Sequence, residues 1–133
     1  SIIAKQEGKS FTLKSQINNI NLFFDENSIL RVVENIISNA FRYARNNVSI
    51  LIYLEQELLT FVIEDDGIGF SKESLKLALR PFYRDKTLND SNAHFGMGLY
   101  ISKILCEKHG GSISIENNST NSAKITAKFS TRN

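Results

Sequence analysis

The hydrophobic period of the chain changes once between residues 25 and 65, and this change limits what the chain can fold into. In 25–44 (DENSILRVVENIISNAFRYA) apolar residues recur at i, i+4, i+7 and i+8, which predicts a long amphipathic helix with Asp25 as its N-cap. The residues of this apolar face are Ile29, Val33, Ile36, Ile37, Ala40 and Ala44. From 48 to 65 the period becomes two, around a short connection at 55–57, which predicts a β-hairpin.

Segments on either side extend both kinds of element. Residues 10–17 alternate weakly and predict a strand, and residues 71–80 predict a short helix that Ser71 caps and Pro81, the only proline, closes. Residues 97–109 predict a further helix. Its helical spacing is carried by Met97, Ile101, Ile104, Leu105 and Lys108.

The end of the chain completes the fold prediction. Gly110 and Gly111 end the last helix, and residues 112–129 predict two strands around an Asn/Ser-rich turn. The order strand, helix, two strands, helix, loop, helix, two strands predicts an α+β fold. We expect a two-layer α/β sandwich, whose mixed, mostly antiparallel sheet of about five strands is covered on one face by about three helices.

Composition restricts the classes of function. With 133 residues, 41% of them hydrophobic, the chain fits one domain with a real core. A net charge of +2 and the lack of a basic run argue against a nucleic-acid partner. The single cysteine, Cys106, cannot form an internal disulfide, so we expect a buried thiol and a reducing compartment. No apolar stretch reaches the ~18 residues of a membrane span, and no signal peptide is visible.

A polar stripe borders the apolar face of the long helix. Asn35, Asn39 and Arg42 are spaced i, i+4, i+7 and fall within roughly 60° of one another on a helix. Amide oxygens are hard ligands that suit Mg²⁺, and arginine pairs with phosphate. Taken alone, the stripe is more typical of a solvated face.

Two glycine pairs suggest close approach of a ligand to the backbone. Asp65 ends the hairpin and is followed by Gly67 and Gly69, which indicates either a carboxylate aimed into a pocket or a plain turn. Gly96 and Gly98 precede a helix, where unpaired N–H groups and the dipole favour phosphate. Neither a Walker loop nor a dinucleotide fingerprint is present.

The remaining polar candidates are weaker. Residues 81–95 form a long polar loop without periodicity, of a length that usually has a functional reason. His94 belongs to that loop, and His109 is expected at a helix C-terminus, where the dipole favours it. Two histidines and one cysteine cannot build a zinc site.

Taken in order, these motifs resemble the ATP-binding catalytic domain of bacterial sensor histidine kinases, members of the GHKL or Bergerat-fold superfamily with gyrase, Hsp90 and MutL. The resemblance extends from Asp25 to Phe129 and treats 1–133 as one domain. DENSILRVVENIISNAFRYA resembles the N-box, EDDGIGF the G1 box, PFYR the F-box and HFGMGLYISKILCEKHGG the G2 box. The corresponding ranges are 25–44, 64–70, 81–84 and 94–111, with an ATP lid at 84–95.

The resemblance implies a site for ATP and Mg²⁺. It implies that Asn39 coordinates Mg²⁺ with help from Asn35, that Arg42 meets a phosphate where the family usually has lysine, and that Tyr43 lines the pocket. It further implies that Asp65 binds the adenine amino group, with Gly67 and Gly69 shaping the turn, and that Phe82 anchors the lid. The other positions that it places at the nucleotide are Arg84, Gly96, Met97, Gly98 and Leu99.

The sequence also departs from the family in places. His94 stands where the first glycine of the last box is usual, which affects the end of the lid, and Ser28 stands where arginine is usual. Asn35 occupies the position of the glutamate that activates water in the family's ATPases, and an amide cannot act as that base. The resemblance therefore favours phosphoryl transfer to a protein over hydrolysis.

The resemblance also implies partners. In sensor kinases the acceptor is a histidine on a separate dimeric helical domain, and neither His94 nor His109 lies in such a context, so we expect that domain to be absent here. The isolated chain is then expected to be inactive, to serve a response regulator and to be the cytoplasmic part of a membrane-anchored sensor. Two alternatives stay open: a serine kinase of the anti-sigma type and a non-catalytic nucleotide-binding module.

Overall fold

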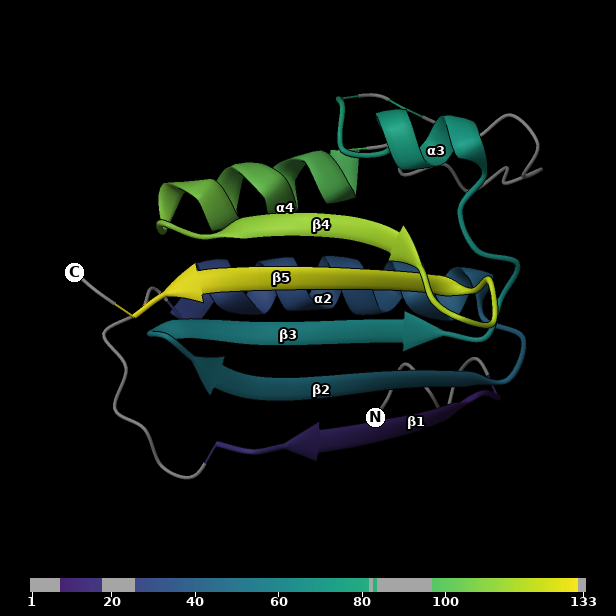
Figure 1. Cartoon of the computed structure of the whole chain (residues 1–133), viewed down its shortest axis with the longest axis horizontal. Coiled ribbons are helices and arrows are strands. Elements are labelled where there is room, and N and C mark those ends of the chain that lie inside the picture. The colour runs from purple at the N-terminus through teal and green to yellow at the C-terminus, as the bar shows by residue number, and fades with distance from the viewer. Residues whose placement is uncertain (1–7, 18–25, 82, 84–96, 132–133) are drawn as a thin grey trace.

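The computed structural model describes residues 8–17, 26–81, 83 and 97–131, and these form one sheet with helices on one side. The elements are β1 (Ser10–Ser15), α2 (Glu26–Tyr43), β2 (Asn47–Glu55), β3 (Leu58–Asp65), α3 (Lys72–Leu77), α4 (Met97–Lys108), β4 (Ser112–Asn117) and β5 (Ala123–Ser130). This is the predicted order of strands and helices (Figure 1). None of the helices in this part of the chain is both long and apolar enough to cross a membrane.

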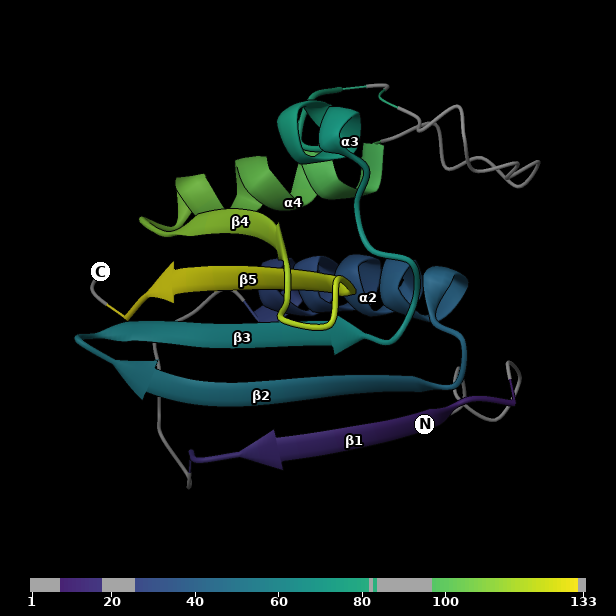
Figure 2. The same ribbon diagram turned by 45° about the vertical axis from the view of Figure 1, so that its right-hand side comes forward.

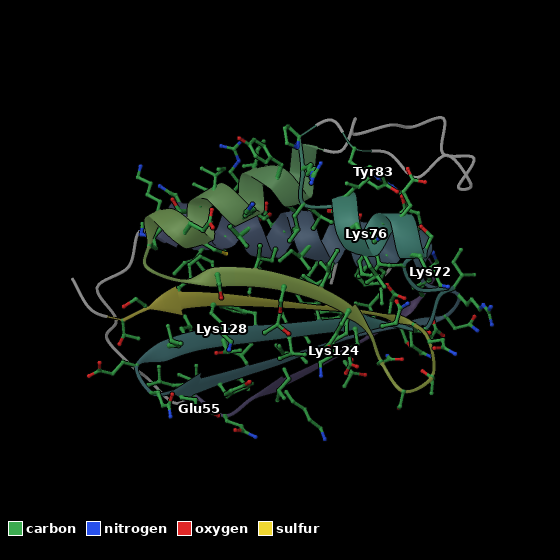
Figure 3. All side chains as sticks on the ribbon, turned by 45° about the horizontal axis from the view of Figure 1, so that its top comes forward. Glu55, Lys72, Lys76, Tyr83, Lys124 and Lys128 are labelled. Carbon is green, nitrogen blue, oxygen red and sulfur yellow. The ribbon has the colours of Figure 1, made fainter. Side chains whose placement is uncertain are left out.

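The five strands lie in the order β1-β2-β3-β5-β4. β1 runs parallel to β2, and the other neighbours are antiparallel, so the predicted mixed sheet is confirmed. The parallel pairing needs a crossover, and α2 is the helix of that crossover, which places it on the sheet. The three described helices lie on the same side of the sheet (Figure 3).

The core lies between the helices and the inward face of the central strands. α2 contributes Val32, Ile36 and Phe41, each with 0% of its surface exposed. Alternate residues of β3 and β5 face them, and the rings of Phe61 and Phe129 meet edge to face at 5.9 Å. The helical period predicted for α2 is correct, although the predicted face left out Val32 and Phe41, which are fully buried.

The face predicted for α4 is correct only in part. Leu105 packs against the core, but Ile104 is 45% exposed and Lys108 is exposed, whereas Ser102 and Cys106 are fully buried. Small side chains occupy part of the contact with the neighbouring elements, so hydrophobicity alone does not find the whole buried face. Burial raises the pKa of the Cys106 thiol to about 12, as suits the buried small residue that was expected.

The end of α4 confirms the role predicted for its two glycines. The Gly111 N–H donates to the Cys106 carbonyl at 2.8 Å and the Gly110 N–H to the Glu107 carbonyl at 3.1 Å, which is a Schellman motif. Gly110 has φ +71°, and a Cβ on Gly111 would lie 1.8 Å from the Lys128 carbonyl oxygen. The two glycines therefore turn the chain from α4 directly into β4.

Predicted boundaries differ slightly from the observed ones. β1 stops at Ser15, and α3 ends at Leu77 instead of continuing to residue 80. The cap at Ser71 is confirmed, since its hydroxyl accepts from the Ser74 N–H at 3.0 Å. The predicted cap Asp25 lies outside the described residues.

Candidate functional site

The candidate residues gather at one end of the sandwich. The C-terminal end of β3, the α2–β2 connection and the β4–β5 turn lie at the right-hand end in Figure 1, and Figure 2 shows the same grouping; α4 begins at its end nearer to them. Antiparallel pairing of β3 with both β2 and β5 brings the start of those two strands to this end. Segments far apart in sequence therefore meet here.

The polar stripe of α2 lies where the sequence predicts it. Asn35, Asn39, Arg42 and Tyr43 are half-buried on the flank of the helix, beside its buried stripe. Among the described residues, the amides of Asn35 and Asn39 make no hydrogen bond, whereas Arg42 has partners. Half-buried amides without protein partners are chemically suited to hold a hard cation. This disfavours a purely solvated face.

Asp65 is the buried carboxylate of the site. It ends β3 with 8% of its surface exposed, and its Oδ1 accepts from the Gly67 N–H at 2.8 Å. Burial raises the pKa of Asp65 above its ordinary value, although the backbone amides of Gly67 and Ala123 lower it. A carboxylate held this way still has oxygen lone pairs that can accept a hydrogen bond from a donor group of a ligand.

The glycines after Asp65 are required by close backbone contacts. A Cβ on Gly67 would lie 2.1 Å from the Tyr43 carbonyl oxygen. Gly69 has φ +77°, and a Cβ there would lie 2.3 Å from the Asn121 carbonyl oxygen. The loop 65–70, here called the G1 loop, is therefore packed between the end of α2 and the β4–β5 turn, and it is more than a plain turn.

Asp66 holds one side of the G1 loop, a role that the sequence reasoning missed. Its carboxylate accepts from the backbone N–H groups of Arg45, Asn46 and Asn47 at 2.8–3.1 Å and from the Asn47 side chain at 3.3 Å. Desolvation alone would raise the pKa of Asp66, but these amides together lower it. The second aspartate of the EDDGIGF motif is the sequence feature that could have indicated this role.

The β4–β5 turn holds the other side, and it was also missed. Asn117 accepts from the Phe70 N–H at 2.7 Å and donates to the Phe70 carbonyl at 2.9 Å. The buried Ser122 hydroxyl donates to the Gly67 carbonyl at 2.6 Å. The sequence predicts this turn from its Asn and Ser content, but these contacts join residues 47 and 55 positions apart.

The first turn of α4 contrasts with the G1 loop. A Cβ on Gly98 would meet no atom of the described residues within 4 Å. The Ser102 hydroxyl donates to the Gly98 carbonyl at 2.8 Å, and Leu99 packs against the core. Met97 begins the helix. The predicted positions Phe82, Arg84 and Gly96, and the lid 84–95, lie outside the described residues.

Comparison with known proteins gives the class. Residues 24–133 match the family described as histidine kinase-, DNA gyrase B- and HSP90-like ATPases. The chain belongs to this family. Within it, the chain is of the type found as the ATP-binding catalytic domain of sensor histidine kinases, as the resemblance implied.

Individual relatives are consistent with this. The sensor histidine kinase CpxA of Escherichia coli (strain K12) is 31% identical over 114 residues, covering 85% of this chain and 25% of CpxA, so this chain spans about a quarter of that relative. The catalytic domain of histidine kinase ThkA gives a TM-score of 0.81 at 21% identity, covering 96% of this chain and 82% of ThkA's. Full-length ShkA in complex with AMPPNP gives 0.81 at 18% identity, covering 99% and 28%.

Proposed function

We propose that this domain binds Mg²⁺-ATP and positions it for phosphoryl transfer to a histidine of a separate helical domain. The observation that carries the proposal is a buried carboxylate at the end of β3, in a loop packed against the last turn of α2, the helix whose Asn35 and Asn39 amides make no hydrogen bond among the described residues. The whole chain, 1–133, is then one ATP-binding domain, with the motif ranges that the sequence predicts.

In this proposal Asp65 recognises the base. Its carboxylate is buried and can accept from the exocyclic amine of adenine, while the G1 loop, held on both sides, keeps that acceptor in place. Such a hydrogen bond to a charged acceptor contributes about 1.5–3 kcal/mol. Tyr43, Gly67 and Gly69 complete the base end of the site.

Asn39 and Asn35 would hold Mg²⁺ in this proposal, and Arg42 and the start of α4 would face phosphate. Bound Mg²⁺ would neutralise phosphate charge. Gly98 leaves room for a phosphate beside the first N–H groups of α4, whose dipole favours an anion. Leu99 and Met97 belong to the same helical turn.

Transfer is favoured over hydrolysis by the residue at position 35. Asn35 cannot take a proton from water, so the domain offers no general base at the position that the family's ATPases use. We therefore propose a histidine kinase whose acceptor domain is supplied separately, with a response regulator downstream and a cytoplasmic placement in a membrane-anchored sensor. The names of the matched relatives favour this over a serine kinase or a silent module.

The test compares Asp65→Asn with Asn39→Ala in calorimetric titrations with ATP, with and without Mg²⁺. Asp65→Asn should weaken binding by about tenfold to a hundredfold in both conditions, because it alters the acceptor for the base. Asn39→Ala should remove only the increase in affinity that Mg²⁺ gives. Ser114→Ala, on the exposed face of β4, is the control. Parent-like ATP binding in Asp65→Asn would contradict the assignment of the base site.

A further inference from the structure

The start of β1 is fastened to the end of α2. The Lys9 ammonium donates to the Phe41 carbonyl at 2.5 Å, and the Ser10 N–H donates to the Asn46 carbonyl at 2.8 Å. These bonds join residues 32 and 36 positions apart. A cation at the C-terminal turn of a helix also complements the helix dipole. Residues 9 and 10 therefore hold the last turn of α2 and its connection to β2.

The same end of α2 contacts the G1 loop. The Tyr43 carbonyl lies against Gly67, and Asp66 binds the backbone of the α2–β2 connection. Lys9 and the G1 loop thus contact the same last turn of α2, Lys9 at the Phe41 carbonyl and Gly67 at the Tyr43 carbonyl. The charge of Lys9 also acts on Asp65: burial, the largest cause, raises the pKa of Asp65, Asp66 adds to that rise, and Lys9 opposes it.

We propose that Lys9 is a positioning residue for the nucleotide site, joining the entry of β1 to the loop that carries Asp65. The inference rests on the proposed function, since it assigns Lys9 to the base-binding end of that site. β1 is an edge strand that pairs only with β2 among the described strands, and its Phe11 also packs against Phe41 of α2, with ring centroids 5.8 Å apart. Lys9 thus acts on the base-binding end through its charge on Asp65 as well as through its bond to α2, and the charge is the part that depends on pH.

The experiment uses the full 133-residue chain and three variants. Lys9→Met removes the charge and keeps an apolar stem, Lys9→Arg restores a cation, and Lys14→Met is the matched control on the same strand, where Lys14 is exposed beside Leu51. Binding of ADP without Mg²⁺ is measured by calorimetry between about pH 5 and about pH 8. The titration of ADP's own phosphate is common to all proteins and cancels in the affinity ratios.

We expect Lys9→Met to bind ADP more weakly than the parent at the acid end, with the deficit shrinking toward neutral pH. The reason is that loss of the cation raises the pKa of Asp65, so a larger fraction of its carboxyl is protonated at acid pH. Lys9→Arg should restore the parent profile, and Lys14→Met should follow the parent throughout.

Two results would overturn the inference: a Lys9→Met profile equal to that of the parent, or a deficit of the same size at every pH, as a purely structural role gives. Either result, obtained while the parent binds ADP and Asp65→Asn binds it more weakly, overturns the inference alone. Failure of the parent to bind ADP would overturn the proposed function together with it.

Discussion

The two glycine pairs look alike in sequence but belong to regions built in opposite ways. In the G1 loop, Gly67 and Gly69 are glycines because backbone from α2 and from the β4–β5 turn already fills the space of a side chain. At the start of α4, Gly98 has open space where its side chain would be, among the described residues. The fold requires glycine in the first region and does not require it in the second.

This difference separates glycines that the packing of the protein requires from glycines that a bound ligand would require. A helix interior loses about 0.5–1 kcal/mol for a glycine in place of alanine, so Gly98, in the first turn of α4, costs up to about this much with no steric reason among the described residues. A close approach of phosphate is the reason that we propose. The G1 loop instead shows how a base-binding carboxylate is kept rigid by contacts on both sides.

The largest effect is expected from Gly67→Ala. Its Cβ would overlap a backbone carbonyl, which cannot rotate away as a side chain could. We expect a loss of about 3 kcal/mol in the free energy of unfolding. Urea unfolding followed by circular dichroism measures it. A variant as stable as the parent would show that the G1 loop can move away from α2, and the comparison of the two regions would fail.

A smaller effect is expected from Asp66→Asn, which tests how firmly the G1 loop is held. The amide nitrogen would face N–H donors that now meet a carboxylate oxygen, so we expect a loss of about 1–2 kcal/mol at neutral pH. The backbone amides lower the pKa of Asp66 in the folded protein. Its stabilising contribution is therefore present above the unfolded pKa and is lost as the pH falls through the folded one.

Stability measured against pH checks this sign. The difference between parent and Asp66→Asn should shrink on acidification below about pH 4. Asp65, whose pKa is raised, contributes with the opposite sign, since its charged form is the disfavoured one. Glu55→Gln, at the exposed end of β2, is the control (Figure 3). A constant difference across the acid range would mean that the Asp66 charge plays no part.

The sequence predicts those parts of the molecule that depend on local periodicity and capping. Patterns among residues close together in the sequence predict the α2 stripe, the hairpin, the Ser71 cap and the glycine turn after α4. The hairpin connection was predicted, although Gln56 and Glu57 adopt φ of 52° and 65° without glycine or asparagine.

Contacts between distant segments were not predictable in the same way. Ser122 in the β4–β5 turn and Asn117 at the end of β4 bind the G1 loop, and Lys9 binds α2 from just before β1. No spacing in a single sequence encodes these pairings. The buried face of α4 was predicted only in part for a related reason. Its contact uses Ser102 and Cys106, whose small size matters only once the neighbouring elements are in place.

The smallest change in stability is expected from Gly98→Ala, and it is the sharpest test of the comparison. Because the new methyl group meets no described atom, alanine should stabilise α4 by about 0.5–1 kcal/mol, the reverse of the effect at Gly67. If the open space beside Gly98 holds phosphate, the same methyl group should weaken ATP binding while leaving adenosine binding unchanged.

Urea unfolding and calorimetry on the same protein preparation separate these two effects. Higher stability together with weaker ATP binding would mean that a ligand, and not the fold, requires the glycine. Lower stability would show that α4 needs glycine for its own packing. Unchanged ATP affinity would show that phosphate does not bind beside Gly98. Only the loss of stability would make Gly98 a structural residue like Gly67, whereas unchanged ATP affinity would leave its glycine required neither by the fold nor by phosphate; either result would contradict the proposed difference between the two regions.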